Sequence, residues 1–207
     1  SSGLGSYFKT AFESLGGTIV TEEQFQTNQS DFKAILTNIK SANPDIIFAP
    51  SSITTAPLII KQAREMGITA VIAAGDTWEN ATIIENAGAD AEGVVLSTFF
   101  DEAAPANDEA ASFIKGFKEY LVSIGEPDII PAVSALGYDA YLCLLQAIKD
   151  ADSTDPAAVR DALENVSVTG VTGDITFNET GDANKSLAFI KTIKDGQFQF
   201  LTTTTLE

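Results

Sequence analysis

The sequence predicts an α/β fold in which helices alternate with the strands of a parallel sheet, and two observations carry this prediction. Short apolar runs without polar alternation occur at 45–49 and 70–74, which is typical of strands buried on both faces of a sheet. Helical patterns at 31–42 and 57–66 precede and separate these runs. Strands that alternate with helices of this length form right-handed units around a parallel sheet.

The first of these helices is predicted from an apolar face and two end signals. Ser30 can cap its start, with Asp31 in the first turn, where a carboxylate suits the helix dipole. Pro44 ends the helix because it cannot continue the hydrogen-bond ladder. The apolar face has the spacing i, i+3, i+4 and i+7 and consists of Phe32, Ile35, Leu36 and Ile39.

The second helix follows the hydroxyl-rich loop 51–55, with Pro57 in its first turn and Gly67 as a left-handed stop. Its partner strand, 70–74, leads directly to Gly75 and Asp76. In open parallel sheets, ligands bind in the crevice outside the carboxyl ends of the strands. Asp76 is therefore the first candidate for a ligand-binding group.

The two ends of the chain differ from this alternating middle. A helical face over 4–15 is followed by an expected strand at 18–20, and a helix of a βα unit needs a strand ahead of it. We therefore expect a fragment, or a chain whose first half was removed. A short helix at 81–86 and a strand at 93–99 complete the alternating part. After a linker-like segment at 101–108, the predicted elements are helices at 110–124, 133–148 and 156–166, and a hairpin that turns at Asp195-Gly196.

Composition excludes several functions. The chain has 207 residues, and 29 acidic against 12 basic side chains give it a charge of −17, which disfavours nucleic acid as a partner. No apolar run is long enough to span a membrane. Histidine is absent, so neither Cys143 nor any serine has an imidazole base, and no histidine metal site can form. We expect no catalytic residues, no metal and no cofactor, and hence no enzyme.

Five local patterns, at 29–32, 61–67, 91–94, 137–140 and 173–177, follow one another across nearly the whole chain. In this order they resemble the type 1 periplasmic binding proteins, and most closely the branched-chain amino acid (leucine/isoleucine/valine) receptors of ABC importers.

The resemblance implies a three-layer parallel sheet flanked by helices, present as a partial two-lobe fold that lacks its N-terminal half. Residues 1–98 would form the second lobe, 99–173 the later part of the first lobe, and 174–207 a crossover with the C-terminal hairpin. It also implies an extracytoplasmic protein, in the periplasm or lipid-anchored at the cell surface. Such a protein closes its lobes over a small amino acid-like ligand and delivers it to membrane permease subunits.

The same resemblance gives Asp76 the role of pairing with the ligand's α-ammonium, although many relatives carry glutamate there. The loop 51–54 aligns with a ligand-facing segment, where relatives often place a tyrosine close to the position of Ser52. Each of these residues also has a structural alternative. Asp76, Ser51 and Ser52 could cap helices, and Trp78 and Tyr138 could belong to the core. The expected ligand-binding residues are Ser51, Ser52, Ile53, Thr54, Asp76, Thr77, Trp78 and Tyr138.

Two other functions compete with solute transport. A sensor of the same fold would bind an amino acid or amide and signal to a partner without transport, and fold alone does not separate it from a transport receptor. An enzyme of flavodoxin-like build would need a glycine loop for phosphate, but Gly3-Leu4-Gly5 lacks the third glycine and a preceding strand.

Overall fold

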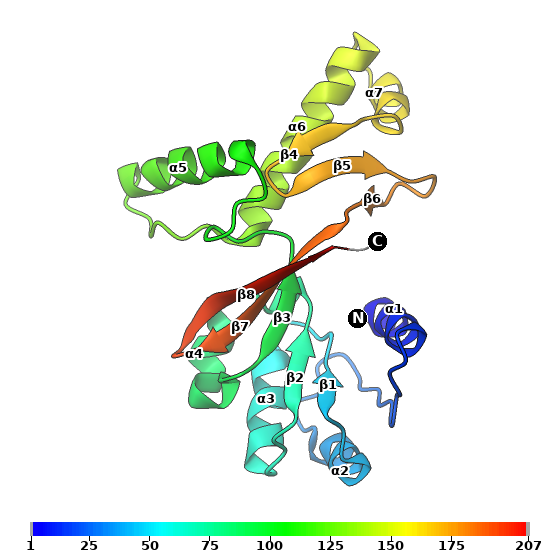
Figure 1. Cartoon of the computed structure of the whole chain (residues 1–207), viewed down its shortest axis with the longest axis vertical. Helices are drawn as coiled ribbons and strands as arrows, with labels where there is room; N and C mark the ends of the chain where they lie inside the picture. The colour runs from blue at the N-terminus through cyan, green and yellow to red at the C-terminus, as the bar shows by residue number, and fades with distance from the viewer. Residues whose placement is uncertain (1, 206–207) are drawn as a thin grey trace. The chain divides into compact units, whose positions relative to one another are not determined.

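A computed structural model describes residues 2–205 and divides the chain into two compact units (Figure 1). Unit 1 comprises residues 1–97 and 191–201, and unit 2 comprises residues 98–190 and 202–207. The chain therefore passes from unit 1 to unit 2 after Ser97 and returns to unit 1 at Lys191.

Unit 1 is built on a sheet with the strand order β1-β2-β3-β7-β8. Strands β1 (Ile46–Phe48), β2 (Val71–Ala74) and β3 (Val95–Thr98) are parallel, with Ile47 opposite Ile72 and Ala74 opposite Leu96. The sheet continues through β7 (Leu187–Lys194) and β8 (Gln197–Thr205). The parallel arrangement predicted from the two apolar runs is confirmed.

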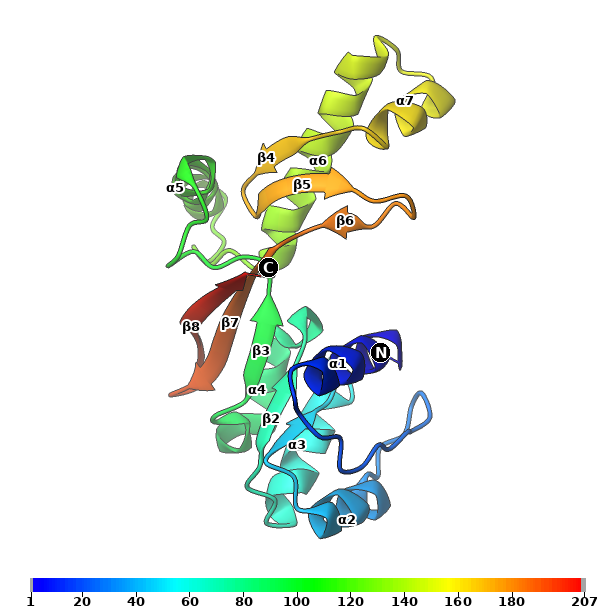
Figure 2. The same ribbon diagram turned by 45° about the vertical axis from the view of Figure 1, so that its right-hand side comes forward.

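Helices α3 (Ala56–Glu65) and α4 (Ala81–Ala87) lie behind the sheet, and α2 (Lys33–Ala42) lies beside α3 (Figures 1 and 2). Two short 3₁₀ helices, η1 (Asp76–Trp78) and η2 (Gly88–Ala91), flank α4. The core of unit 1 joins these helices to the strands. Its largest fully buried side chains are Phe32, Leu36, Ile60, Ile72, Trp78, Ile83, Leu96 and Ile193.

Helix α1 (Ser2–Ser14) lies beside the carboxyl ends of β1 and β2 (Figure 2). Phe8 stacks on Phe48 of β1, with ring centroids 4.0 Å apart. No residue of α1 is buried, so this helix covers the strand ends with one apolar face and leaves the rest of its surface in water.

Two local predictions are wrong. Residues 18–20 are not a strand: they do not join the sheet, in which β1 is an edge strand and pairs with β2 alone. Helix α2 begins at Lys33, later than Ser30. The distant side chain of Gln62 accepts a bond from the Phe32 amide at 2.7 Å and donates to the Ser30 carbonyl at 2.8 Å. The Asp31 carboxylate accepts the Lys33 amide at 3.0 Å, so Gln62 and Asp31, and not Ser30, satisfy this terminus.

Unit 2 contains the long helices α5 (Asp108–Ser123) and α6 (Ala132–Ala151), which belong to the predicted consecutive helices. The third, α7 (Pro156–Leu163), starts as predicted: the Asp155 carboxylate accepts bonds from two amides of its first turn, each at 3.1 Å. A small antiparallel sheet follows, formed by β4 (Val168–Gly170), β5 (Gly173–Phe177) and β6 (Ala183–Asn184).

The predicted hairpin joins β7 to β8. Asp195 and Gly196 have φ values of 53° and 69°, and positive φ at both central residues is the requirement of a type I′ turn. In Figure 1, β7 runs opposite to β3 and thus returns the chain along the sheet of unit 1.

Candidate functional site

The candidate site consists of two loops at the carboxyl ends of neighbouring strands of unit 1. Residues 49–55 follow β1, and residues 75–80 follow β2. The two strands pair in parallel from Ile46 opposite Val71 to Phe48 opposite Ala73, so both loops leave the sheet at the same edge. The sequence-predicted residues 51–54 and 76–78 are therefore brought to one end of one sheet.

Asp76 opens a tight turn and is only partly buried. The turn closes through the Trp78 amide to the Gly75 carbonyl at 3.1 Å and the Glu79 amide to the Asp76 carbonyl at 2.9 Å. Within residues 2–205, no hydrogen bond or ion pair engages the Asp76 carboxylate. Asp76 does not cap α4, because Asn80 does so by accepting a bond from the Thr82 amide at 3.0 Å.

The other side chains of this turn are attached to the loop after β1. The Trp78 indole N–H donates to the Ser51 carbonyl at 3.0 Å, and the Thr77 hydroxyl donates to the same oxygen at 3.3 Å. Trp78 is 0% exposed and belongs to the core, so its ring performs the packing role, while its contribution to a ligand wall stays a prediction. These bonds fix the Asp76 turn against the first loop.

The Ser51 side chain is the unusual group of the site. It is 4% exposed, and its hydroxyl is the one buried side-chain oxygen or nitrogen in the described part of the chain without a hydrogen-bond partner. A buried hydroxyl without a partner is unfavourable by about 1–3 kcal/mol. In native proteins nearly every such group has a partner, whether protein, water or ligand, so the Ser51 hydroxyl is available to a water or a ligand.

The rest of the first loop is a hydroxyl cluster at the surface. The Ser52 hydroxyl bonds to the hydroxyls of Thr54 at 2.9 Å and Thr55 at 3.2 Å. Ser52 and Thr54 are exposed, and Ile53 between them is partly buried. Thr55 is the N-cap of α3 without a side-chain capping bond, and the Ser52 carbonyl accepts the amides of Thr55 and Ala56.

The sequence reading missed the first turns of α1 as part of this region. A Cβ atom on Gly75 would lie 3.1 Å from Leu4 Cδ2, and one on Gly5 would lie 3.9 Å from the Pro50 ring. Apolar atoms of α1 thus border both loops. The glycine directly ahead of Asp76 was the available signal, because it marks a place where another segment approaches the backbone.

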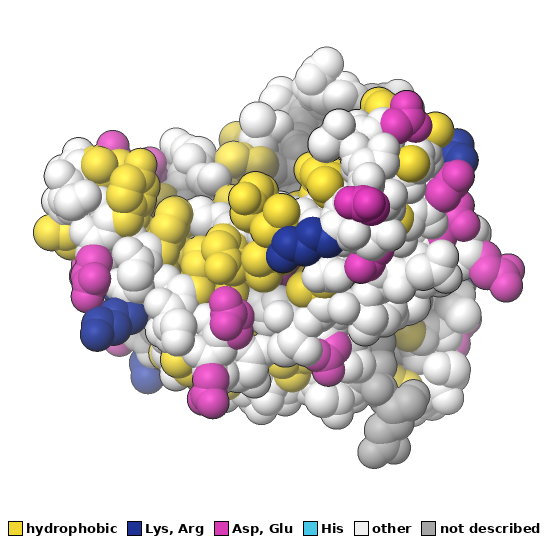
Figure 3. Space-filling model, turned by 90° about the horizontal axis from the view of Figure 1, so that it is seen from above, with side chains coloured by type: hydrophobic (Ala, Val, Ile, Leu, Met, Phe, Trp, Pro, Cys, Tyr) yellow, Lys and Arg dark blue, Asp and Glu magenta, His cyan; other side chains and the backbone are white. Residues whose placement is uncertain are grey.

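Tyr138 belongs to unit 2, whereas the other candidate residues belong to unit 1. It packs on Phe113, with ring centroids 4.9 Å apart, in a groove of about 540 Å³ between α5 and α6. Figure 3 shows hydrophobic side chains gathered on this face of the molecule, on the side where Figure 1 places α5. Aromatic side chains make up half of the groove's lining residues, and none of these residues has a buried polar group that lacks a partner.

Unit 2 contains a buried polar cluster around Asp139, whose hydrogen bonds stabilise the fold. The Asp139 carboxylate, on a residue 2% exposed, accepts the amides of Val171 at 2.7 Å and Thr172 at 2.9 Å, and also the Thr172 hydroxyl. Lys185 donates to the same hydroxyl. Burial lowers the pKa of Lys185 and raises the pKa of Cys143, one turn after Asp139 on α6, which favours the neutral thiol. Asp139 therefore anchors the β4–β5 turn to α6.

Among residues 2–205, no group of three acidic or cysteine side chains is arranged to hold a metal ion. The same residues contain no helix that combines the length and apolar character needed to cross a bilayer.

Comparison with known proteins places the chain in one family. A model of the periplasmic binding protein family matches residues 2–197. The chain is 30% identical to Leu/Ile/Val-binding protein homolog 1 of Brucella abortus over 182 residues, which are 87% of this chain and 47% of that protein. The chain thus spans about half the length of the curated relatives that it matches.

Solved structures agree. The leucine-binding protein LivK of Thermotoga maritima superposes with a TM-score of 0.87 at 33% identity, over 99% of this chain and 57% of that one. The branched-chain amino acid transporter substrate-binding protein LivJ of Streptococcus pneumoniae, solved with isoleucine, superposes with a TM-score of 0.76 at 25% identity, over 96% of this chain and 55% of that one. The predicted fold class and the predicted resemblance are confirmed. The chain belongs to the type 1 periplasmic binding proteins.

Proposed function

We propose that this chain is part of an extracytoplasmic solute-binding protein of an ABC importer. In this proposal the protein binds a small amino acid-like ligand, branched-chain or otherwise apolar, between two lobes and delivers it to permease subunits in the membrane. Residues 1–98 would belong to the second lobe and 99–173 to the first, with 174–207 crossing between them. Support comes from the family and from relatives whose names specify leucine, isoleucine and valine.

The observation that carries the proposal is the pair of unused polar groups at the strand ends. An α-amino acid has an ammonium and a carboxylate at one end, and each needs a partner when water is excluded. The Asp76 carboxylate, which the turn presents with no partner among residues 2–205, can take the ammonium. The buried Ser51 hydroxyl can donate to an oxygen of the ligand. Ser52, Ile53, Thr54 and Thr77 would line this side of the site, and Trp78 and Tyr138 are the proposed aromatic wall.

The direct test follows the backbone amide signals of the 207-residue chain by NMR while leucine is added to millimolar concentrations. We expect weak binding, with shifts at 51–54 and 75–78. The same titration with 4-methyl-2-oxopentanoate, which lacks the ammonium, should give much smaller shifts. In a protein with both halves of the site, Asp76→Ala should lower leucine affinity by roughly 2–5 kcal/mol, because the ammonium would be buried unpaired.

Asp45→Asn is the matched control, because Asp45 is exposed and lies next to the opposite, amino end of β1. This variant should bind leucine as the wild type does, whereas Asp76→Asn should not. Equal shifts with leucine and with the oxo acid would contradict the ammonium assignment. Tight one-to-one binding by the 207-residue chain would contradict a ligand held between two lobes.

A further inference from the structure

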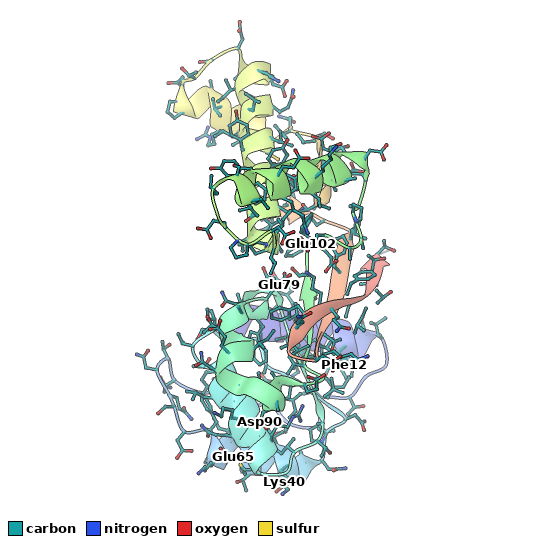
Figure 4. All side chains as sticks on the ribbon, turned by 90° about the vertical axis from the view of Figure 1, so that its left-hand side faces the viewer. Phe12, Lys40, Glu65, Glu79, Asp90 and Glu102 are labelled. Carbon is teal, nitrogen blue, oxygen red and sulfur yellow. The ribbon has the colours of Figure 1, made fainter. Side chains whose placement is uncertain are left out.

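The residue that ends the Asp76 turn forms a buried ion pair with a strand 112 residues further along the chain. The Glu79 carboxylate bonds to the Lys191 ammonium, and their side chains are only 10% and 7% exposed. Figure 4 labels Glu79 at the end of unit 1 to which β1, β2 and β3 direct their carboxyl ends. Lys191 belongs to β7 and is the residue at which the chain re-enters unit 1.

Stability alone does not explain this pair. Removing two charges from water costs several kcal/mol per ion, and apolar side chains of similar size often replace a buried pair without loss of stability. What a buried pair adds is a defined geometry, because either partner is strongly unfavourable if it moves away from the other. The informative question is therefore which two parts of the structure Glu79 and Lys191 hold in register.

The pair completes a two-sided attachment of the Asp76 turn. On one side, Thr77 and Trp78 donate to the Ser51 carbonyl in the loop after β1. On the other side, Glu79 reaches β7, which is separated from β2 by β3 in the sheet. Of the four successive residues 76–79, the last three are tied to neighbouring elements, and the Asp76 carboxylate is presented between them.

We propose that Glu79 and Lys191 are positioning residues for the ligand site: their ion pair sets the placement of the Asp76 turn relative to β7, the segment that leads from unit 2 into unit 1. This role rests on the proposed function, since it acts through Asp76. Ligand affinity then depends on a contact that the ligand itself does not make, because a displaced carboxylate meets the ammonium poorly.

The chain contains a suitable probe for this test. Trp78 is its only tryptophan, directly precedes Glu79 and is fully buried. Its emission and its quenching by acrylamide therefore report the placement of the turn without any ligand. Glu79→Gln and Lys191→Met each remove one charge with little change in volume, and Lys191→Arg keeps the charge. Lys118→Met is the matched control, because it removes the Lys118–Glu102 pair of unit 2.

We expect Lys191→Met and Glu79→Gln to increase the quenching of Trp78 several-fold, while Lys191→Arg and Lys118→Met leave it close to the wild-type value. In the leucine titration, each of the two single variants should weaken the shifts at 75–78 about tenfold. The double variant should be no worse than the worse single variant, because both remove the same interaction. Thermal unfolding followed by circular dichroism identifies any variant that simply loses its fold.

The possible failures are distinguishable. If wild-type chain shows no response to leucine while the quenching pattern holds, the proposed function is wrong and the positioning of the turn stands. If leucine binds and Lys191→Met changes neither quenching nor affinity in a folded protein, the positioning role is wrong. Effects of the two single variants that simply add in the double variant would also overturn it.

Discussion

Gly170→Ala is the substitution whose effect follows most directly from the structure. A Cβ atom at position 170 would lie 2.4 Å from Oδ1 of Asp139 and 2.6 Å from its Cγ. Ordinary contact begins at 3.4 Å, so the carboxylate must move by 3.4 − 2.4, or about 1 Å. Gly170 is not among the residues with positive φ, so the expected effect comes from the collision and not from backbone strain.

The magnitude follows from the bonds that this movement breaks. Asp139 accepts the amides of Val171 and Thr172 and the Thr172 hydroxyl inside the protein. A hydrogen bond to a charged group contributes about 1.5–3 kcal/mol. Losing two of them costs about 3–6 kcal/mol. Against a gain of roughly 0.4–1 kcal/mol from a less flexible unfolded chain, the net destabilisation is roughly 2–5.6 kcal/mol.

The assay is urea unfolding followed by far-UV circular dichroism, because Trp78 lies in unit 1 and does not report unit 2. Amide hydrogen exchange should show lost protection at Val171 and Thr172. Gly137→Ala is the control: it lies in α6 with no atom near its Cβ position, and alanine should stabilise the helix by up to about 1 kcal/mol. A Gly170→Ala protein within roughly 0.5 kcal/mol of wild type would refute the reasoning.

Three further outcomes are expected. The pKa of Cys143 lies above its ordinary value of 9.0, chiefly because of burial and then because of Asp139. The folded state therefore keeps a proton that the unfolded state releases, so the free energy of unfolding should fall as pH rises above about 9. Urea unfolding at pH 8 and pH 10 measures this decrease, and Cys143→Ala should remove the contribution of the thiol to it. Asp155→Ala should destabilise the protein by about 1 kcal/mol in the same assay at neutral pH, because two amides of α7 lose their acceptor. Lys118→Met should cost less than about 1 kcal/mol, since both partners of its ion pair are one-third exposed.

The elements that the sequence predicted correctly are those specified by local chemistry. Apolar runs bounded by proline and glycine located β1 and β2, and Asp155-Pro156 located the start of α7. The turn at Asp195-Gly196 was likewise predicted, because few residues accept two successive positive φ values. In each case the determining atoms lie within a few residues of the element.

The features that were missed depend on residues far away in the chain. Residues 18–20 have the composition of a strand, but a strand forms only beside a partner. The start of α2 was misplaced because Gln62, 30 residues away from Phe32, accepts the amide of this N-cap residue. The site has the same limit: the position of Asp76 at a strand end was predictable, whereas the Trp78–Ser51 bond and the Glu79–Lys191 pair were not.

Asp139 and Asp76 illustrate how the donors around a carboxylate separate a structural role from a functional one. Asp139 lies within the 137–140 pattern that carried the resemblance, whereas Asp76 was predicted as a ligand-binding group from its position after the strand at 70–74. Asp139 is buried with three donors supplied by its own chain, so its charge is already compensated. Asp76 is held by a turn whose other side chains are attached on both sides, and no protein donor reaches its carboxylate within residues 2–205. A carboxylate that the fold orients and leaves uncompensated is the one that can exchange water for the ammonium of a ligand.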